Sequence, residues 1–343
     1  MNKLKINNII MEKKLEEQNI IIEKYINKNN EEKIRKYNKG KLLKKGVFSQ
    51  TFEFINLDNF HISSGKIFPK SKDDNANTKK NYFITEKNII KSLHHPNIVK
   101  LENFFEDSEN SYLLFEFCPY GNLKDLLNKR KKLTELEVKY YLLQIVSALK
   151  YLRNNKVIHR NLKLENILIS DKMIIKLSDF HLGAKLKSDE ERRTKNLGSP
   201  NYMAPEIIEK KNGYSYEVDI WALGVIIYCL IIGKAPFDSP NIDEACEKIK
   251  IGKYFFPEDS VISDPAKDLI QNLLLLDPNK RLKLDEILSH AFLNLNINIP
   301  KTLPEYTLKE PPKFDFIKQY EGDNKYNIII KTISMLIMKR MKK

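Results

Sequence analysis

Hydrophobic and polar residues alternate between residues 41 and 68, and this pattern predicts β-strands. Thr51-Phe52-Glu53-Phe54 is the clearest stretch, while Gly46 and the pair Asp58-Asn59 break the runs into separate strands. Further along, we expect a helix over residues 79–93 and another strand over residues 111–117. This part of the chain is therefore predicted to form a small β-rich lobe.

From residue 118 onward the pattern is mostly helical. Thr134 and Glu137 form a capping-box signature, and an apolar stripe follows on one helical face: Leu142, Ile145, Val146, Leu149 and Leu152. Residues 220–232 are apolar all round, as expected for a helix buried at the centre of a domain. A β-rich lobe followed by a larger helical lobe predicts a bilobal α+β fold, with an N-lobe at about 39–117 and a C-lobe at about 118–294.

Both ends of the chain are predicted to lie outside this domain, which we place at 39–294. Residues 1–38 are rich in Lys, Glu and Asn, and their apolar residues recur at gaps of seven and four: Leu4, Met11, Leu15, Ile22 and Ile26. We expect a helical extension there, either resting on the domain or pairing as a short coiled coil. Residues 295–343 form the tail, and within it the segment 325–343 is predicted to be a basic amphipathic helix. It could dock on its own domain, lie on an anionic membrane or bind an acidic partner such as a calmodulin-like protein.

Composition narrows the class of protein. Of 343 residues, 42% are hydrophobic and 30% are charged, as in soluble globular proteins. The net charge of +14 favours acidic partners, but no nucleic-acid motif accompanies it, so we expect no nucleic-acid binding. Cys118, Cys229 and Cys246 lack the spacing of a zinc site or a disulfide framework. We find neither a secretory signal nor a transmembrane segment, and we therefore expect a cytoplasmic or nuclear protein.

The most informative motif is His159-Arg160-Asn161-Leu162-Lys163-Leu164-Glu165-Asn166, which follows the protein-kinase pattern H-R-D-L-x-x-x-N with one substitution. Asn161 stands where the pattern has the Asp that accepts the proton of the substrate hydroxyl. An amide has nearly the shape of a carboxylate, but it is uncharged and takes up no proton near neutral pH. This substitution decides whether the chain can still phosphorylate proteins.

Further kinase motifs follow in the expected order and spacing: Ser64-Gly65-Lys66, Glu86, Asp179-Phe180-His181, Gly198 to Glu206, Asp219-Ile220-Trp221 and Arg281. The chain resembles protein kinases over its central part, and Lys163 is the choice of the serine/threonine type. Several stretches are similar to Polo-like kinases: Leu43 to Ser49, Gly65 to Ser71, Asn103 to Asp107, Arg192 to Thr194, Ile299 to Pro304 and Pro311 to Phe314. The similarity covers about 39–315, and because only roughly thirty residues follow in this sequence, we expect it to contain none of that family's phosphopeptide-binding polo-boxes.

This resemblance implies ATP and Mg²⁺ as cofactors and protein Ser/Thr as substrate. Lys66, paired with Glu86, would bind the α- and β-phosphates, and Lys163 would bind the γ-phosphate. Asn166 and Asp179 would hold the metal ion. The remaining nucleotide contacts would come from residues around the base and the phosphates: Leu43, Gly46, Thr51, Ser64, Glu116, Cys118 and Leu168. Arg160 would receive a phosphate on the activation segment, where Thr194 is the candidate. Glu206 is expected to pair with Arg281, and Asp219 to hold the backbone of the catalytic loop.

Several positions besides Asn161 depart from the family pattern. Lys44 and Ser49 replace the outer glycines of the phosphate-binding loop, which makes its backbone less free to approach the phosphates. His181 replaces the glycine after Asp-Phe, and we do not expect its side chain to replace the missing base. Lys195 stands where the family's regulatory Thr falls, so Thr194 would serve only if the loop slides by one residue.

Three interpretations remain open at this point. The chain is a pseudokinase that binds Mg-ATP and acts as a partner-binding module, or a slow serine/threonine kinase, or an adaptor that binds no nucleotide. Retention of Lys66, Glu86, Lys163, Asn166 and Asp179 favours nucleotide binding. The substitutions at Asn161 and His181 favour impaired catalysis.

Overall fold

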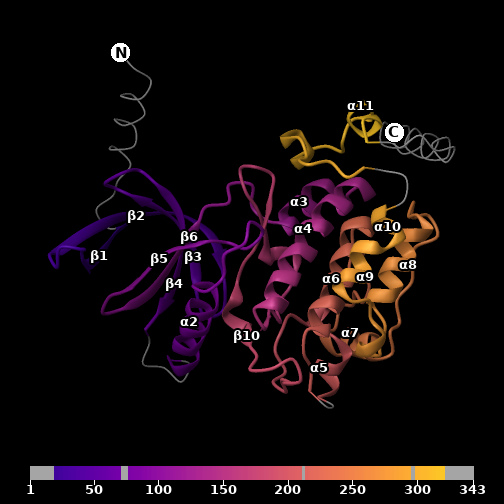
Figure 1. Cartoon of the computed structure of the whole chain (residues 1–343), viewed down its shortest axis with the longest axis horizontal. Coiled ribbons are helices and arrows are strands. Elements are labelled where there is room, and N and C mark those ends of the chain that lie inside the picture. Colours follow the sequence, from indigo (N-terminus) through magenta and orange to yellow (C-terminus); the bar gives the residue numbers. More distant parts are fainter. Residues whose placement is uncertain (1–18, 71–75, 211–212, 295–297, 321–343) are drawn as a thin grey trace. The chain divides into compact units, whose positions relative to one another are not determined.

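A computed structural model describes residues 19–70, 76–210, 213–294 and 298–320 (Figure 1). These residues divide into two compact units. The first contains the described residues up to His94 together with Val99–Cys118, and the second contains His95–Ile98 and the described residues from Pro119 onward. The predicted basic helix at 325–343 and the first half of the predicted helical extension lie outside the described residues.

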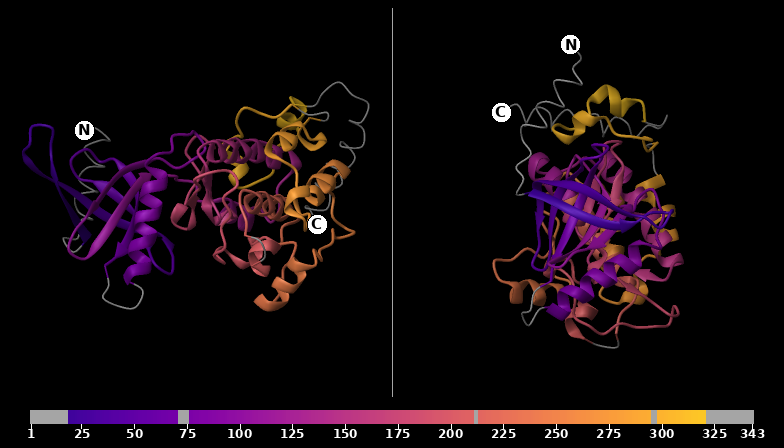
Figure 2. Two further views of the ribbon diagram at one scale, coloured as in Figure 1. Left: turned by 60° about the horizontal axis from the view of Figure 1, so that its bottom comes forward. Right: turned by 90° about the vertical axis from the view of Figure 1, so that its left-hand side faces the viewer.

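The first unit is built on one antiparallel sheet of six strands in the order β1-β2-β3-β4-β6-β5. The predicted strands and helix are confirmed, with boundaries shifted by a few residues. Its elements are β1 (Ile20–Ile26), β2 (Glu32–Lys45), β3 (Gln50–Asn56), β4 (Ile62–Pro69), α2 (Ala76–Ile90), β5 (Leu101–Glu106) and β6 (Asn110–Glu116). Helix α2 packs against β4, where the rings of Phe83 and Phe68 lie 5.7 Å apart (Figures 1 and 2).

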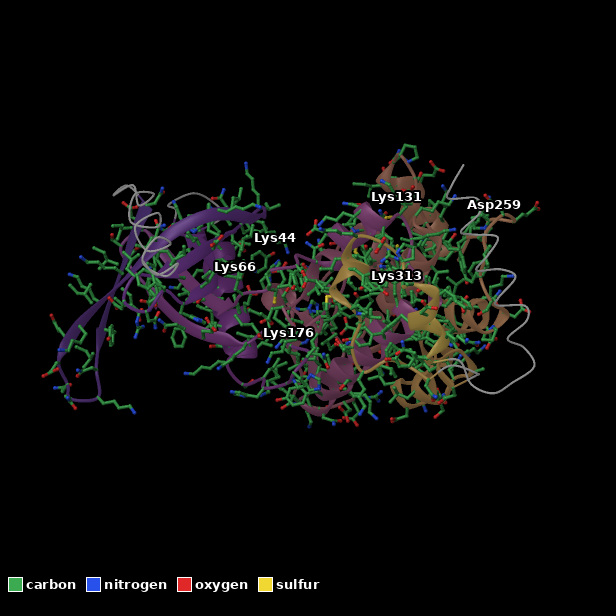
Figure 3. The ribbon with its side chains drawn as sticks, turned by 90° about the horizontal axis from the view of Figure 1, so that it is seen from above. Lys44, Lys66, Lys131, Lys176, Asp259 and Lys313 are labelled. Carbon is green, nitrogen blue, oxygen red and sulfur yellow. The ribbon has the colours of Figure 1, made fainter. Side chains whose placement is uncertain are left out.

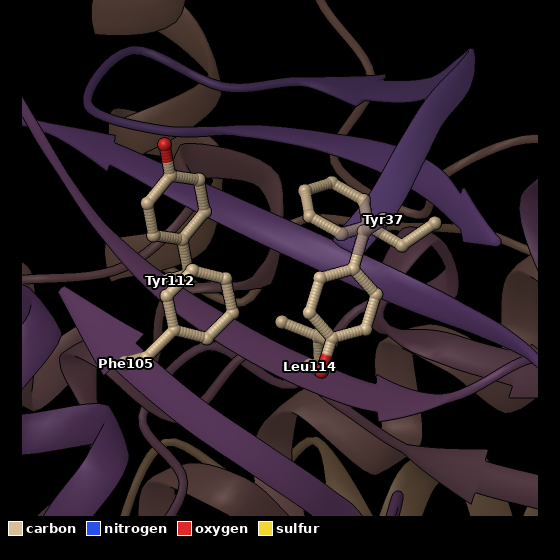
Figure 4. Close-up of a cluster of buried hydrophobic side chains, with 5 residues drawn as sticks. Tyr37, Phe105, Tyr112 and Leu114 are labelled. Carbon is tan, nitrogen blue, oxygen red and sulfur yellow. The ribbon is translucent and has the colours of Figure 1, made fainter. Parts of the chain in front are cut away.

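Aromatic side chains fill the core of this sheet. The core cluster consists of Tyr37, Phe54, Phe105, Tyr112 and Leu114 (Figure 4). The rings of Phe105 and Tyr112 are stacked with centroids 4.5 Å apart. Gly65 on β4 makes room for this packing, because a Cβ atom at that position would lie 2.2 Å from the ring of Phe54. The glycine of the Ser64-Gly65-Lys66 motif therefore has a structural role beside the functional lysine.

The helix predicted over residues 1–38 is wrong for residues 19–38, the part of it that the structure describes. Ile20–Ile26 and Glu32–Lys45 form an antiparallel hairpin, with Ile22 opposite Lys36. A polar cluster holds β1 in place, because the Glu23 carboxylate, which is buried, accepts hydrogen bonds from Arg35 (2.8 Å), Tyr37 (2.8 Å) and Asn103 (2.9 Å). Three donors compensate the cost of burying one charge, and this long-range network selects strand over helix.

The second unit is mainly helical and confirms the predicted C-lobe class. Its helices are α3 (Leu123–Arg130), α4 (Glu135–Asn154), α5 (Pro205–Glu209), α6 (Glu217–Ile232), α7 (Ile242–Lys250), α8 (Asp264–Leu273), α9 (Leu284–Ser289), α10 (Ala291–Asn294) and α11 (Phe314–Lys318). Short strands β7 (Val157–Ile158) and β10 (Ala184–Lys185) pair with each other, as do β8 (Ile167–Ile169) and β9 (Ile175–Leu177). Five 3₁₀ turns lie between these elements: Leu164–Asn166, Phe180–Leu182, Pro200–Tyr202, Pro278–Lys280 and Glu305–Leu308.

Helix α6 is the centre of the second unit, as its apolar sequence predicts. Trp221 is fully buried and stacks on Phe237 at 5.5 Å. Gly224 allows α8 to approach, since a Cβ atom there would lie 2.9 Å from Leu273. The helix that carries Asp219 is therefore fixed on several sides. Among the described residues, no helix combines the length and apolar character needed to span a bilayer.

The capping box at the start of α4 is confirmed and is connected to the tail. Glu137 accepts hydrogen bonds from the Thr134 backbone N–H (2.9 Å) and forms a buried ion pair with Arg130 (2.7 Å). Arg130 also donates to the backbone carbonyl of Thr307 in the tail, and Thr307 is 1% exposed. Part of the segment after residue 294 is thus packed against α3 and α4 rather than extending away from them.

Candidate active site

The lysine and glutamate predicted to position ATP form an ion pair in the first unit. Lys66 lies on β4 and Glu86 on α2, and Lys66 Nζ is 2.7 Å from Glu86 Oε2 (Figure 3 labels Lys66). Their side chains are 9% and 1% exposed. A buried charge of this kind is stable only beside a partner of opposite sign. The contact that the kinase resemblance implies is therefore present.

The other residues that the kinase resemblance assigns to nucleotide binding in this unit lie on the sheet or next to it. Gly46 is in the turn between β2 and β3, where its N–H donates to the Ser49 carbonyl at 2.9 Å. Lys44 on β2 is in register with Thr51 on β3. Four more are on or beside the strands: Leu43 on β2, Ser64 on β4, Glu116 at the end of β6 and Cys118 two residues further on. Their roles toward a nucleotide remain predictions.

In the second unit, a buried carboxylate holds the backbone of the catalytic loop. Asp219 on α6 accepts hydrogen bonds from the N–H groups of His159 (2.8 Å) and Arg160 (2.9 Å), as predicted. Burial raises the pKa of Asp219 to about 6, and these two N–H donors oppose that rise. His159 packs on the ring of Phe180 at 4.7 Å. The backbone that presents Asn161 is thus fixed from α6.

Asn161 is held in the catalytic loop by three contacts. Its Oδ1 accepts a hydrogen bond from the Ser199 hydroxyl at 3.1 Å, and its backbone carbonyl accepts one from Asn166 Nδ2 at 2.8 Å. Its own N–H donates to His159 Nδ1 at 3.3 Å, and the residue is 7% exposed. The side chain therefore occupies a defined position, but it offers an amide instead of a base. Sequence reasoning did not identify Ser199 as its partner.

The two predicted metal ligands are connected through the β8–β9 hairpin. Ser178 donates from its N–H and its hydroxyl to the Asn166 carbonyl, at 2.9 and 3.0 Å, and Asp179 follows it directly. Asp179 adopts a left-handed backbone conformation with φ of 74°. Two further residues predicted to contact the nucleotide lie close to Asn166 in the sequence: Lys163 just before the turn Leu164–Asn166, and Leu168 on β8.

His181, the residue in place of the family glycine, contacts Asp179. The distance between His181 Nδ1 and Asp179 Oδ1 is 2.5 Å, and the two side chains are 20% and 10% exposed. This contact agrees with the prediction that His181 does not replace the missing base. It also brings the histidine into contact with a predicted metal ligand, which sequence reasoning had not foreseen.

Arg160, predicted to receive an activating phosphate, is bound to groups of the protein itself. Its guanidinium donates to the carbonyls of Leu182 (2.6 Å) and Gly183 (3.0 Å), and weakly to the Tyr214 hydroxyl (3.4 Å). The Tyr214 hydroxyl donates in turn to the Lys195 carbonyl at 2.6 Å. Thr194 is exposed. Tyr214 therefore links the activation segment to Arg160 without a phosphate, and no local sequence signal could have identified it.

We expect Tyr214→Phe to loosen the activation segment. The substitution removes one strong and one weak hydrogen bond, together worth about 0.5–1.5 kcal/mol, so tryptic cleavage at Arg192, Arg193 or Lys195 should accelerate about two- to tenfold. Limited proteolysis with mass spectrometry measures these sites. Tyr228→Phe is the matched control, because the Tyr228 hydroxyl donates to the distant Phe255 carbonyl at 2.7 Å. Equal cleavage of both variants would contradict a role for Tyr214 in holding the segment.

The end of the activation segment is anchored by the predicted buried ion pair. Arg281 donates two hydrogen bonds to the Glu206 carboxylate, both at 2.7 Å. Arg281 also donates to the carbonyls of Leu275 and Glu217, both at 2.8 Å, and its guanidinium lies 5.0 Å from the centroid of the Trp221 ring. The side chain of Arg281 therefore connects the activation segment to α6 and to the turn that precedes α9.

Comparison with known proteins agrees with this geometry. A model of the protein kinase domain matches residues 37–293. The probable serine/threonine-protein kinase CCRP1 of Zea mays is 50% identical over 287 residues, which are 84% of this chain and 46% of the maize protein. The probable serine/threonine-protein kinase PLK of Dictyostelium discoideum is 40% identical over 307 residues, 89% of this chain and 31% of that protein. Cell cycle serine/threonine-protein kinase CDC5/MSD2 of Saccharomyces cerevisiae is 40% identical over 287 residues, 83% of this chain and 40% of the yeast protein.

The chain spans less than half the length of these curated relatives. Within that span it keeps the Lys66–Glu86 pair, the loop held by Asp219 and the Glu206–Arg281 pair. The family model covers most of the sequence. The chain therefore belongs to the protein kinase family, where its relatives place it with the Polo-like serine/threonine kinases.

Proposed function

We propose that this chain binds Mg-ATP and that its transfer of phosphate to protein Ser or Thr is weakened or lost. The observation that carries the proposal is Asn161. It lies in the position of the catalytic base with a defined geometry, between Ser199 and a backbone held by Asp219. Such a protein would act mainly as a nucleotide-dependent binding module for protein partners.

The residues present suit the two cofactors. Mg²⁺ prefers oxygen ligands, which Asp179 and Asn166 can supply from their carboxylate and amide groups. The Lys66 ammonium, oriented by Glu86, suits the α- and β-phosphates, and Lys163 suits the γ-phosphate. When bound, the metal ion neutralises charge on the phosphates. Leu43, Gly46, Thr51, Ser64, Glu116, Cys118 and Leu168 complete the set that we assign to the nucleotide.

Asn161 changes what the site can do with the substrate hydroxyl. Its amide can hydrogen-bond a hydroxyl but cannot remove the proton, and general-base catalysis is typically worth about 10²- to 10⁴-fold. Loss of the negative charge also weakens the orientation of the hydroxyl for attack. Because the transition state of phosphoryl transfer is loose, the proton can leave late, and a low rate can survive.

A second candidate function is that of an active serine/threonine kinase. The names of the curated relatives favour it, since they describe kinases, and so does the intact Lys66–Glu86 pair. The two functions differ in rate, and phosphorylation of casein or an acidic-directed Ser peptide with labelled ATP separates them. A turnover number in the range of ordinary protein kinases, about 1–100 s⁻¹, would support the active enzyme.

Nucleotide binding should be visible as stabilisation. At a hundredfold excess over its Kd, Mg-ATP stabilises the folded state by about 2.7 kcal/mol, so the melting temperature should rise by about 4–8 °C. Lys66→Met and Asp179→Asn should each remove most of this shift, as measured by differential scanning fluorimetry.

Lys70→Met is the matched control for this measurement. Lys70 is 39% exposed and pairs with Glu106 at 2.9 Å, so its loss should leave the nucleotide shift unchanged. If millimolar Mg-ATP gives the unmutated chain no shift, only an adaptor that binds no nucleotide remains.

The cellular setting follows from the same assignment. We infer a cytoplasmic or nuclear protein whose partners or substrates are proteins rather than nucleic acids. For the segment 325–343, docking on its own domain, binding to an acidic partner and contact with an anionic membrane all remain proposals.

A further inference from the structure

We propose that His181 is a third ligand of the metal ion at Asp179 and Asn166, and that this site prefers first-row transition ions such as Co²⁺ or Zn²⁺ over Mg²⁺. The inference rests on the nucleotide binding proposed above and deepens it, because it concerns the kind of ion that accompanies the nucleotide. All three residues belong to the second unit.

The geometry brings a nitrogen donor to the predicted metal site. His181 Nδ1 lies 2.5 Å from Asp179 Oδ1. Asp179 has a left-handed backbone conformation and the turn Phe180–Leu182 follows it directly, and the two side chains meet across the one residue between them. Neighbouring ligands of an octahedral ion stand about 2.9 Å apart at bond lengths of about 2.0–2.1 Å, so a small side-chain rotation is sufficient to admit an ion between them.

Both side chains are partly accessible to solvent, with exposed fractions of 20% for His181 and 10% for Asp179. In the neutral imidazole, a proton on Nε2 leaves the Nδ1 lone pair directed toward the ion. The other nearby histidine is already engaged, since His159 Nδ1 accepts from the Asn161 N–H and Nε2 lies 3.0 Å from the Ser178 carbonyl.

The change of ligand set changes the preferred ion. Carboxylate and amide oxygens suit Mg²⁺, whereas an imidazole nitrogen suits Co²⁺, Ni²⁺, Cu²⁺ and Zn²⁺. A site with glycine at position 181 would offer oxygen ligands alone. We therefore expect the ratio of the Mg²⁺ to the Co²⁺ dissociation constant, measured in the presence of ADP, to fall at least about tenfold in His181→Gly.

A spectroscopic measurement tests ligation independently of catalysis. The full chain is prepared with ¹⁵N-labelled histidine, and the complex with Mn²⁺ and ADP is studied by electron spin echo envelope modulation. Coupling of a histidine ¹⁵N nucleus to Mn²⁺ is expected in the unmutated chain and not in His181→Gly. The isotope separates this signal from the nitrogens of adenine.

His181→Gln distinguishes ligation from simple hydrogen bonding. Its amide can still donate to Asp179, but it supplies no imidazole nitrogen. If the histidine only restrains the Asp179 carboxylate, His181→Gln keeps the metal preference of the unmutated chain and no histidine coupling is seen, which overturns the proposal. If Mn²⁺ with ADP does not bind at all, nucleotide binding and this inference fall together. Binding without histidine coupling overturns the inference alone.

Discussion

Asn161→Asp is expected to raise the rate of phosphotransfer to a Ser peptide at least about tenfold, which is a fraction of what a positioned general base supplies. The Asp side chain would occupy a position in which its hydrogen-bond donor and its backbone are already fixed. The Ser199 hydroxyl, 3.1 Å from Asn161 Oδ1, can donate equally to a carboxylate, and the backbone remains held by Asp219. Only the charge and the ability to accept a proton change. Initial rates with labelled ATP measure the effect.

Two further variants control this experiment. Asn161→Ala removes the amide without adding a base, so its rate should not exceed that of the unmutated chain. Asn161→Asp combined with Asp179→Asn should return the rate to background, which excludes a contaminating kinase as the source of the gain. An unchanged rate in Asn161→Asp would place the block elsewhere, at His181, at Lys44 or in the activation segment.

Arg281→Leu is expected to lower the free energy of unfolding by about 3–5 kcal/mol, because it leaves the buried Glu206 carboxylate without its partner. The two groups share a pair of hydrogen bonds at 2.7 Å, and their side chains are 1% and 10% exposed. Urea unfolding followed by circular dichroism measures the loss.

A double variant and a surface variant sharpen this measurement. Arg281→Leu with Glu206→Leu should regain at least about 1 kcal/mol, since no charge is then left unpaired. Lys248→Ala removes an exposed pair with Glu244 one turn away and should cost about 0.3–0.5 kcal/mol. Equal losses in the single and double variants would show that the lost carbonyl contacts of Arg281, rather than the unpaired charge, cause the destabilisation.

The parts of the fold that sequence predicted well are those in which local pattern and tertiary packing agree. Helix α6 is apolar on every side, and only a central position satisfies such a helix, so its burial followed directly. The Lys66–Glu86 pair was expected from the resemblance to protein kinases, and the two charges do meet in a buried position.

The β1–β2 hairpin was missed because two patterns competed over the same residues. Ile22 and Ile26 are four residues apart and suit a helix, but they also share one face of a strand. Asn27, Asn29 and Asn30 were a turn signal that favoured the hairpin. What decides the outcome is Glu23, whose partner Asn103 lies 80 residues away. No local pattern contains that information.

Around the candidate site, too, local sequence identified the residues but not their long-range partners. Positions 161 and 181 were identified as departures, but not the groups that face them. Ser199 reaches Asn161 across 38 residues, and Tyr214 reaches Arg160 across 54 residues. Such pairs depend on how the activation segment is folded, which spacing within a motif does not specify.

The contacts of Arg130 with Glu137 and Thr307 indicate that the folded domain extends beyond the residues that the family model matches. The family match stops at residue 293, yet the Thr307 carbonyl shares the guanidinium that pairs with Glu137, and Leu303 is 2% exposed. At the other end, the match begins at Tyr37, whose hydroxyl is bonded to Glu23. A fragment cut at the family's edges would uncover apolar surface and leave buried charges short of partners. A fragment for expression and crystallisation should therefore include β1 and the tail through at least Thr307.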